Sequence, residues 1–214
     1  MRPVVCMVTA PISSRADEDF LIERIAAAAR GGVHLVQIRQ RRLEGLTATR
    51  LVERAVRAVS GTVARVIVND RVDVALAAGA HGVHLRGDSL AASRVRSIVP
   101  PPFVIGRSVH AIGEAVEAER RGGLDYLLFG TVFATGSKPG AAPAGMERLA
   151  DVCAAVALPV LAIGGITATT IAPVARAGAA GFAAIGLFAN QAIEALPSAM
   201  AHGVAAFDTP GGLS

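Results

Sequence analysis

The chain has 214 residues, of which 52% are hydrophobic and only 4% aromatic, and its formal net charge is +4. This length fits one domain near the lower size limit of a (β/α)8 barrel. The positive charge comes from scattered arginines, and few aromatic rings are available to stack on bases, so the composition argues against nucleic-acid binding but suits an anionic metabolite.

Short apolar runs alternate with longer segments of helical pattern along the chain. We expect strands at residues 4–8, 34–38, 65–68, 82–85, 104–106, 126–129, 160–163 and 181–185. We expect helices at residues 17–30, 47–60, 71–78, 90–99, 112–121, 145–156, 167–177 and 188–202. The strands lack strict alternation of apolar and polar residues, as is typical of parallel strands that are buried on both faces.

This alternation predicts an α/β fold, a single-domain (β/α)8 TIM barrel over residues 1–205 with a loose C-terminal tail at 206–214. An open Rossmann-type sheet is the alternative. It is disfavoured because no Gly-x-Gly-x-x-Gly follows the first strand.

Polar groups follow the second and third expected strands. Gln37, Arg39 and Arg41 occupy alternate positions and therefore lie on one side of the chain, where they form either an anion clamp or a solvated turn. Asn69 and Asp70 follow the third strand, and one of them could cap the next helix.

Two histidines lie near the fourth and fifth expected strands. His84 lies within the fourth strand, and a structural role is the simpler interpretation. Ser108 is a candidate cap for the helix after the fifth strand, which would place His110 in the first turn of that helix. A helix N-terminus disfavours the imidazolium, so we expect His110 to be a neutral base near pH 7.

The last three connections carry groups that suit an anion. Thr135 and Lys138 lie on the longest connection, residues 130–144, and could close over a phosphate or carboxylate. Gly164 and Gly165 end the seventh strand, and Ile185 and Gly186 end the eighth. Free backbone N–H groups at such strand ends, late in a barrel, predict a phosphate site.

Cys6 and Cys153 have no His or Cys neighbours at metal-ligand spacing, so we expect a reduced, cytoplasmic protein. The apolar run at residues 3–8 is too short for a signal peptide. No stretch approaches the roughly 18 apolar residues of a membrane span. We therefore expect neither a membrane nor a nucleic acid as partner.

Seven motifs, in this order, together resemble the thiamine phosphate synthase / thiazole tautomerase family. They are Val36-Gln-Ile-Arg39, Val68-Asn-Asp-Arg-Val-Asp-Val-Ala75, Gly82-Val-His-Leu85, Gly106-Arg-Ser-Val-His110, Asp125-Tyr-Leu-Leu-Phe-Gly-Thr-Val-Phe-Ala-Thr-Gly-Ser-Lys138, Ala162-Ile-Gly-Gly-Ile166 and Ala177-Gly-Ala-Ala-Gly181. The resemblance extends over nearly the whole chain. It implies a phosphorylated thiazole as substrate and a homodimer as the assembly.

The resemblance implies one of two activities. Synthases join hydroxymethylpyrimidine diphosphate to thiazole phosphate with Mg²⁺, whereas tautomerases aromatise a carboxythiazole phosphate without a metal. Here Arg41 stands at a synthase lysine, Gly87 at a glutamine and Ser89 at a magnesium-binding aspartate. Arg107 stands where synthases tend to have an apolar residue, and Gly106-Arg-Ser-Val-His110 is closer to tautomerases. These departures favour the tautomerase branch.

We therefore expect a thiazole tautomerase, an isomerase without a cofactor. In this hypothesis His110 moves the proton, Arg39, Arg41 or Arg107 holds the substrate carboxylate, and Gln37 positions the ring. One alternative is the Mg²⁺-dependent synthase, which Thr135-Gly-Ser-Lys138 and Asn69-Asp70 favour. The other is a non-catalytic regulatory protein that binds thiazole phosphate.

Overall fold

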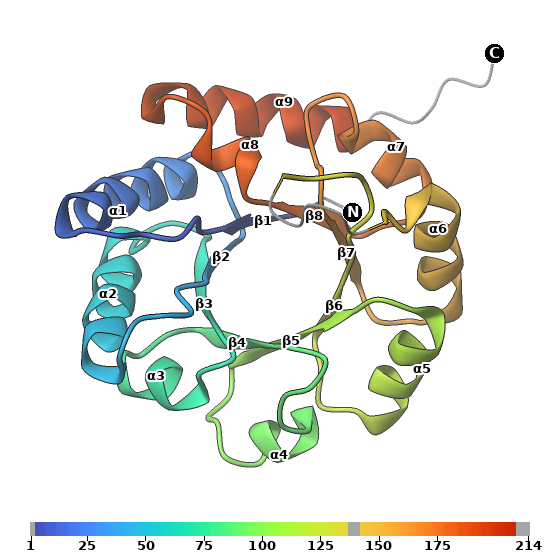
Figure 1. Ribbon diagram of the computed structural model, residues 1–214, viewed down its shortest axis with the longest axis horizontal. Helices are drawn as coiled ribbons and strands as arrows, with labels where there is room; N and C mark the ends of the chain where they lie inside the picture. Colours follow the sequence, from blue (N-terminus) through green and yellow to red (C-terminus); the bar gives the residue numbers. More distant parts are fainter. Residues whose placement is uncertain (1–2, 137–141, 209–214) are drawn as a thin grey trace.

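The computed structural model describes residues 3–136 and 142–208. Within these residues the eight strands pair in parallel in sequence order, and β8 pairs with β1 to close a barrel (Figure 1). The predicted (β/α)8 fold is confirmed. The strands are β1 (Val4–Val8), β2 (Leu35–Ile38), β3 (Arg65–Asn69), β4 (Gly82–Leu85), β5 (Val104–Val109), β6 (Tyr126–Phe129), β7 (Val160–Ile163) and β8 (Gly181–Ala184).

Helices surround the barrel on the outside (Figure 1). They are α1 (Arg15–Arg30), α2 (Gly45–Ala58), α3 (Val72–Ala77), α4 (Ala92–Arg96), α5 (Ile112–Arg121), α6 (Gly145–Ala155), α7 (Ile171–Arg176), α8 (Gly186–Ala189), the 3₁₀ helix η1 (Ile193–Ala195) and α9 (Leu196–Asp208). Among the described residues, no helix is both long enough and apolar enough to cross a membrane.

The expected helix at residues 188–202 is wrong in its continuity, because the chain forms α8, η1 and α9 there. The guanidinium of Arg24, on α1, donates to the carbonyls of Phe188 and Gln191, the latter at 2.7 Å. These two carbonyls therefore accept from a side chain and not from a backbone N–H group of a continuing helix. Pro197 suits the first turn of the new helix α9, where no backbone N–H group is needed. Helix α9 runs to Asp208, three residues past the expected end of the barrel unit at 205.

Alternate strand residues pack into two separate apolar clusters. One set, which includes Val5, Met7 and Val36, packs under the helices. The other set lies inside the barrel, and its buried members are Cys6, Val8, Leu35, Ile67, Tyr126, Leu128, Leu161 and Ala183. Strand parity therefore determines which residues near the strand ends face the barrel axis.

Candidate active site

A cavity of about 980 Å³ opens at the C-terminal ends of the strands. Most of the site residues expected from the sequence line it: Gln37, Arg39, Arg41, Asn69, Ser108, His110, Thr135, Gly164, Gly165, Ile185 and Gly186. Lys138 lies outside the described residues. Arg107 is the expected site residue within the described part that does not line the cavity.

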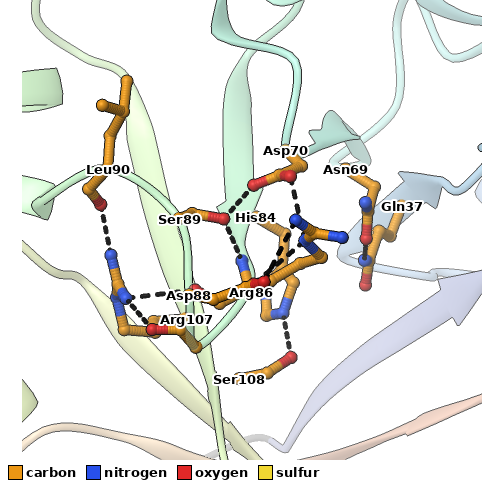
Figure 2. A network of polar contacts seen from close by, with 11 residues as sticks. Gln37, Asn69, Asp70, His84, Arg86, Asp88, Ser89, Leu90, Arg107 and Ser108 are labelled. Atoms are coloured by element: carbon orange, nitrogen blue, oxygen red, sulfur yellow. Dashed lines mark hydrogen bonds and ion pairs between the residues drawn. The ribbon is translucent and has the colours of Figure 1, made fainter.

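Gln37 lies near the C-terminal end of β2 and Asn69 ends the neighbouring β3, and both face the barrel axis by strand parity. Gln37 is buried, and its Nε2 donates to Oδ1 of Asn69 at 3.0 Å (Figure 2). The Oε1 atom of Gln37 is the one buried side-chain polar atom without a hydrogen-bond partner in the described chain. A buried carbonyl oxygen of this kind costs free energy until a donor reaches it, so Oε1 is suited to accept from a substrate N–H group.

His84 is a structural residue beneath the cavity, as expected. Its Nδ1 lies 3.0 Å from the hydroxyl of Tyr126, and its Nε2 lies 2.8 Å from Oγ of Ser108. Burial lowers the pKa of His84 to about 3, and the positive charge of Arg107 adds to this effect. The ring is therefore neutral at pH 7, with one nitrogen as donor and the other as acceptor.

Two sequence predictions for the fifth strand are wrong. Ser108 lies within β5 and contacts His84, so it does not cap the next helix, whose N-cap is Ala111. His110 precedes that helix and does not lie in its first turn. Nδ1 of His110 donates to the carbonyl of Gly130, because a carbonyl oxygen can only accept.

Arg107 points away from the barrel axis. On β5, Gly106 faces inward, because a Cβ there would lie 2.1 Å from the ring of Tyr126. The next residue must face outward by alternation. The guanidinium of Arg107 donates to the carbonyls of Arg86 and Gly87, both at 3.0 Å, and to that of Leu90. The expected contact with substrate is not supported; Arg107 fixes the loop after β4.

Neither Asn69 nor Asp70 caps helix α3. Its N-cap residue is Arg71, whose side chain makes no capping hydrogen bond to the helix. Asp70 instead adopts a left-handed backbone conformation (φ 64°). Its Oδ1 accepts from the hydroxyl of Ser89, and its Oδ2 lies 3.0 Å from Nε of Arg86 (Figure 2). The expected cap is therefore replaced by a polar cluster that joins the ends of β3 and β4.

Arg86 and Asp88 line the cavity, and sequence reasoning assigned them no role. Nε of Arg86 lies 3.2 Å from Oδ1 of Asp88, so this guanidinium contacts two carboxylates. The signal was available, because Arg86 and Asp88 follow the inward-facing His84 at alternate positions.

Arg39 and Arg41, which follow β2, supply positive charge at the same opening, and Arg41 lines a smaller pocket together with Asp70 and Arg86. The backbone N–H of Arg39 donates to Oγ1 of Thr9 at 2.9 Å, which fixes this strand end. Burial lowers the pKa of Arg39, and the neighbouring charge of Arg41 lowers it further. Within the described chain no carboxylate forms an ion pair with either arginine, so an anionic ligand would relieve their repulsion.

Glycine is required at the end of β7. Gly164 and Gly165 have φ values of 101° and 65°, and a Cβ on Gly164 would lie 2.4 Å from Cγ2 of Thr131. For the described part of the chain, no acceptor is assigned to the backbone N–H groups of Gly164, Gly165 or Gly186. These groups at the cavity wall are suited to bind a phosphate.

The acidic groups at the opening do not fit Mg²⁺. Mg²⁺ at a diphosphate site is usually held by one or two carboxylates together with phosphate oxygens and waters. The two carboxylates that follow β3 and β4, those of Asp70 and Asp88, are already joined by the guanidinium of Arg86. Magnesium requires close, near-octahedral oxygen ligands, and a permanent cation between the two carboxylates opposes that arrangement.

Comparisons with known proteins agree over most of the chain. Residues 5–188 match the family described as thiamine monophosphate synthase. A thiamine-phosphate synthase of Methanoculleus marisnigri is 47% identical over 167 residues, 77% of each chain. One of Chlorobium luteolum is 39% identical over 185 residues, 86% of this chain and 84% of that protein.

Solved structures support the same grouping. A thiamine phosphate pyrophosphorylase from Pyrococcus furiosus superposes with a TM-score of 0.83 at 28% identity, covering 96% of this chain and 97% of that one. A 3-hexulose-6-phosphate synthase, 17% identical with a TM-score of 0.70 over 96% and 99% of the two chains, shares the fold. The expectation of a thiazole tautomerase is wrong on these findings, because the similar curated proteins are named synthases.

Proposed function

We propose that this chain, which belongs to the thiamine monophosphate synthase family, joins hydroxymethylpyrimidine diphosphate to thiazole phosphate and releases diphosphate. The proposal makes the protein a transferase and replaces the isomerase expected from the sequence. The names of its relatives support it, as does one feature of the cavity that a thiazole alone does not explain.

That feature is the unpartnered Oε1 of Gln37. A thiazole phosphate carries no N–H group, whereas the aminopyrimidine of the other substrate carries an amino group. An amino group that donates to Oε1 would satisfy this buried acceptor, with Asn69 holding the amide of Gln37 in place. This pairing supports a pyrimidine beside β2 and β3.

The reaction has simple requirements. The lone pair of the thiazole nitrogen forms a bond to the methylene carbon of the pyrimidine, and the bond from that carbon to the diphosphate oxygen breaks with its electrons on the oxygen. Negative charge therefore grows on the diphosphate, and cations fixed nearby stabilise the transition state. Arg39, Arg41 and Arg86 line the cavity and supply such charge.

The thiazole phosphate has a separate place in this proposal. We assign it to the backbone N–H groups at Gly164, Gly165, Ile185 and Gly186, which line the cavity at the ends of β7 and β8. The coupling abstracts no proton from the thiazole ring, so His110 acts as part of the cavity wall and not as the base expected from the sequence.

An assay with purified protein and both substrates, with Mg²⁺ or with EDTA, tests the proposal. We expect thiamine phosphate and diphosphate in equal amounts in at least one of the two conditions. Binding of both substrates without product in either condition would refute the synthase and support a non-catalytic protein. Homodimer assembly stays a prediction from the resemblance, and a cytoplasmic location stays a prediction from the cysteine content.

A further inference from the structure

The guanidinium of Arg86 occupies the space between the carboxylates of Asp70 and Asp88. Its Nε lies 3.0 Å from Oδ2 of Asp70 and 3.2 Å from Oδ1 of Asp88, and its Nη2 lies 3.4 Å from Oδ2 of Asp88 (Figure 2). The other oxygen of Asp70 accepts from Ser89. Both oxygens of Asp70 are thus engaged within the protein.

A divalent ion at this place would have to displace Arg86. Magnesium binds oxygens at about 2.0–2.1 Å and keeps several waters, so it cannot share the two carboxylates with a guanidinium in contact with both. The guanidinium stays charged at any working pH and cannot yield by losing a proton. The cluster therefore already contains a cation where a bridging metal would supply one.

The charged side chains that line the cavity are mainly positive, so they can attract an anion even when no metal ion is bound. Among the described lining residues, three carry guanidinium groups, Arg39, Arg41 and Arg86, and one carries a carboxylate, Asp88. A second observation points to a ligand at the same opening, because the buried Gln37 presents an unpartnered oxygen there.

We propose that Arg86 takes the part of a divalent cation, so that the diphosphate binds to Arg86, Arg39 and Arg41 and leaves without a metal ion. This inference rests on the proposed coupling reaction. As the carbon–oxygen bond breaks, its electron pair stays on the diphosphate, and the three guanidinium groups donate hydrogen bonds to the charged oxygens. No proton or further reactant is required.

Calorimetry with inorganic diphosphate in EDTA tests the anion site without reference to turnover. We expect the wild-type protein to bind diphosphate, and Arg86→Gln to raise its Kd roughly ten-fold or more. Arg120→Gln is the matched control, because Arg120 pairs with Glu117 on the exposed face of α5, away from the cavity, and its loss removes the same charge. Equal Kd values for wild type and Arg86→Gln would overturn the inference.

Mn²⁺ binding, followed by electron paramagnetic resonance, tests the missing metal site. We expect no Mn²⁺ bound by the wild-type protein at micromolar concentrations in the absence of diphosphate, which itself chelates the ion. The double variant Arg86→Gly/Ser89→Asp removes the internal cation and adds a carboxylate beside Asp70, and we expect it to bind Mn²⁺. A wild-type protein that binds Mn²⁺ tightly, and binds diphosphate only with it, would overturn the inference.

The two proposals fail in different ways. Coupling that occurs only with added Mg²⁺ would support the synthase and refute the role of Arg86. Diphosphate binding in EDTA that depends on Arg86, without coupling in any condition, would refute the synthase and support the metal-free anion site. Coupling in EDTA that falls in Arg86→Gln but not in Arg120→Gln supports both.

Discussion

Nε2 of His84 lies 2.8 Å from Oγ of Ser108, so a side-chain hydrogen bond joins β4 to β5 directly beneath the cavity. The other ring nitrogen contacts Tyr126 on β6. One neutral ring thus connects three neighbouring strands inside the barrel. Burial lowers the pKa of this ring to about 3. This connection makes the stability of the barrel depend on pH.

Acid should destabilise the protein through His84. In the unfolded chain the histidine binds a proton below about pH 6.5, whereas in the folded chain it stays neutral down to about pH 3. The unfolded state therefore binds more protons between these values, and stability falls as the pH falls. From pH 6 to pH 4 we expect this group to cost about 2–3 kcal/mol.

Denaturant unfolding of wild type and His84→Gln at pH 4, 5 and 6 measures this effect. Glutamine offers a donor and an acceptor but does not titrate. We expect the wild type to lose more stability than the variant as the pH falls, because other groups titrate equally in both. Parallel losses in the two proteins would show that His84 is not held neutral.

The backbone at Gly164 should tolerate no side chain. Gly164→Ala adds a Cβ within 2.4 Å of Thr131 at a φ of 101°, which we expect to cost about 1–3 kcal/mol and to displace the adjacent N–H groups. Displacement of these phosphate-binding N–H groups should raise the KM for thiazole phosphate about ten-fold. Steady-state kinetics and thermal unfolding check both effects.

Gly113→Ala is the control for this substitution. Gly113 lies in α5, and a Cβ there would meet no atom within 4 Å. We expect unchanged kinetics and a gain of about 0.4–1 kcal/mol in stability, because alanine loses less entropy in a helix. A loss of thiazole affinity in both variants would contradict a specific role for Gly164.

How much of this site follows from the sequence depends on strand parity. The glycine ends of β7 and β8 and the inward-facing Gln37 were predictable, because each follows a clear apolar run. The outward direction of Arg107 was not. The sequence suggested that the fifth strand ends at Gly106, but pairing of Ser108 with Leu128 and of Val109 with Phe129 extends it to Val109. That extension depends on a neighbouring strand and leaves no local signal.

The break after α8 and the cluster around Arg86 escaped prediction for the same reason. Residues 188–202 have a helical pattern, and only the distant Arg24 takes up the carbonyls of Phe188 and Gln191. The contact of Arg86 with Asp70 depends on the register of β3 against β4, which places Asn69 beside His84. Tertiary contacts of this kind override local propensity.

Arg107 and Arg39 should respond differently to substitution. Arg107→Lys removes the planar fork that holds the carbonyls of Arg86, Gly87 and Leu90, so we expect a lower unfolding temperature. Arg39→Gln should leave stability unchanged or raise it, because the guanidinium is partly buried beside Arg41 without an ion-pair partner in the described chain. Its kcat/KM should fall about ten-fold or more.

Thermal unfolding and kinetics of the two variants, measured together, separate a structural from a substrate-binding arginine. A large drop in kcat/KM for Arg107→Lys at unchanged unfolding temperature would contradict the outward placement of Arg107. Unchanged kcat/KM for Arg39→Gln would contradict its place beside the diphosphate.

Gln37→Leu should separate the two substrates. Leucine has a similar size and removes the buried oxygen that lacks a partner, but it also removes the hydrogen bond to Asn69, so we expect little net change in the stability of the free protein. The same change removes the acceptor for the pyrimidine amino group. We therefore expect the KM for the pyrimidine diphosphate to rise about ten- to one-hundred-fold, with little change for thiazole phosphate. Asn69→Ala, which frees the amide of Gln37 to rotate, should give a smaller effect in the same direction. If Gln37→Leu weakened both substrates equally, the unpartnered oxygen would not be the group that selects the pyrimidine.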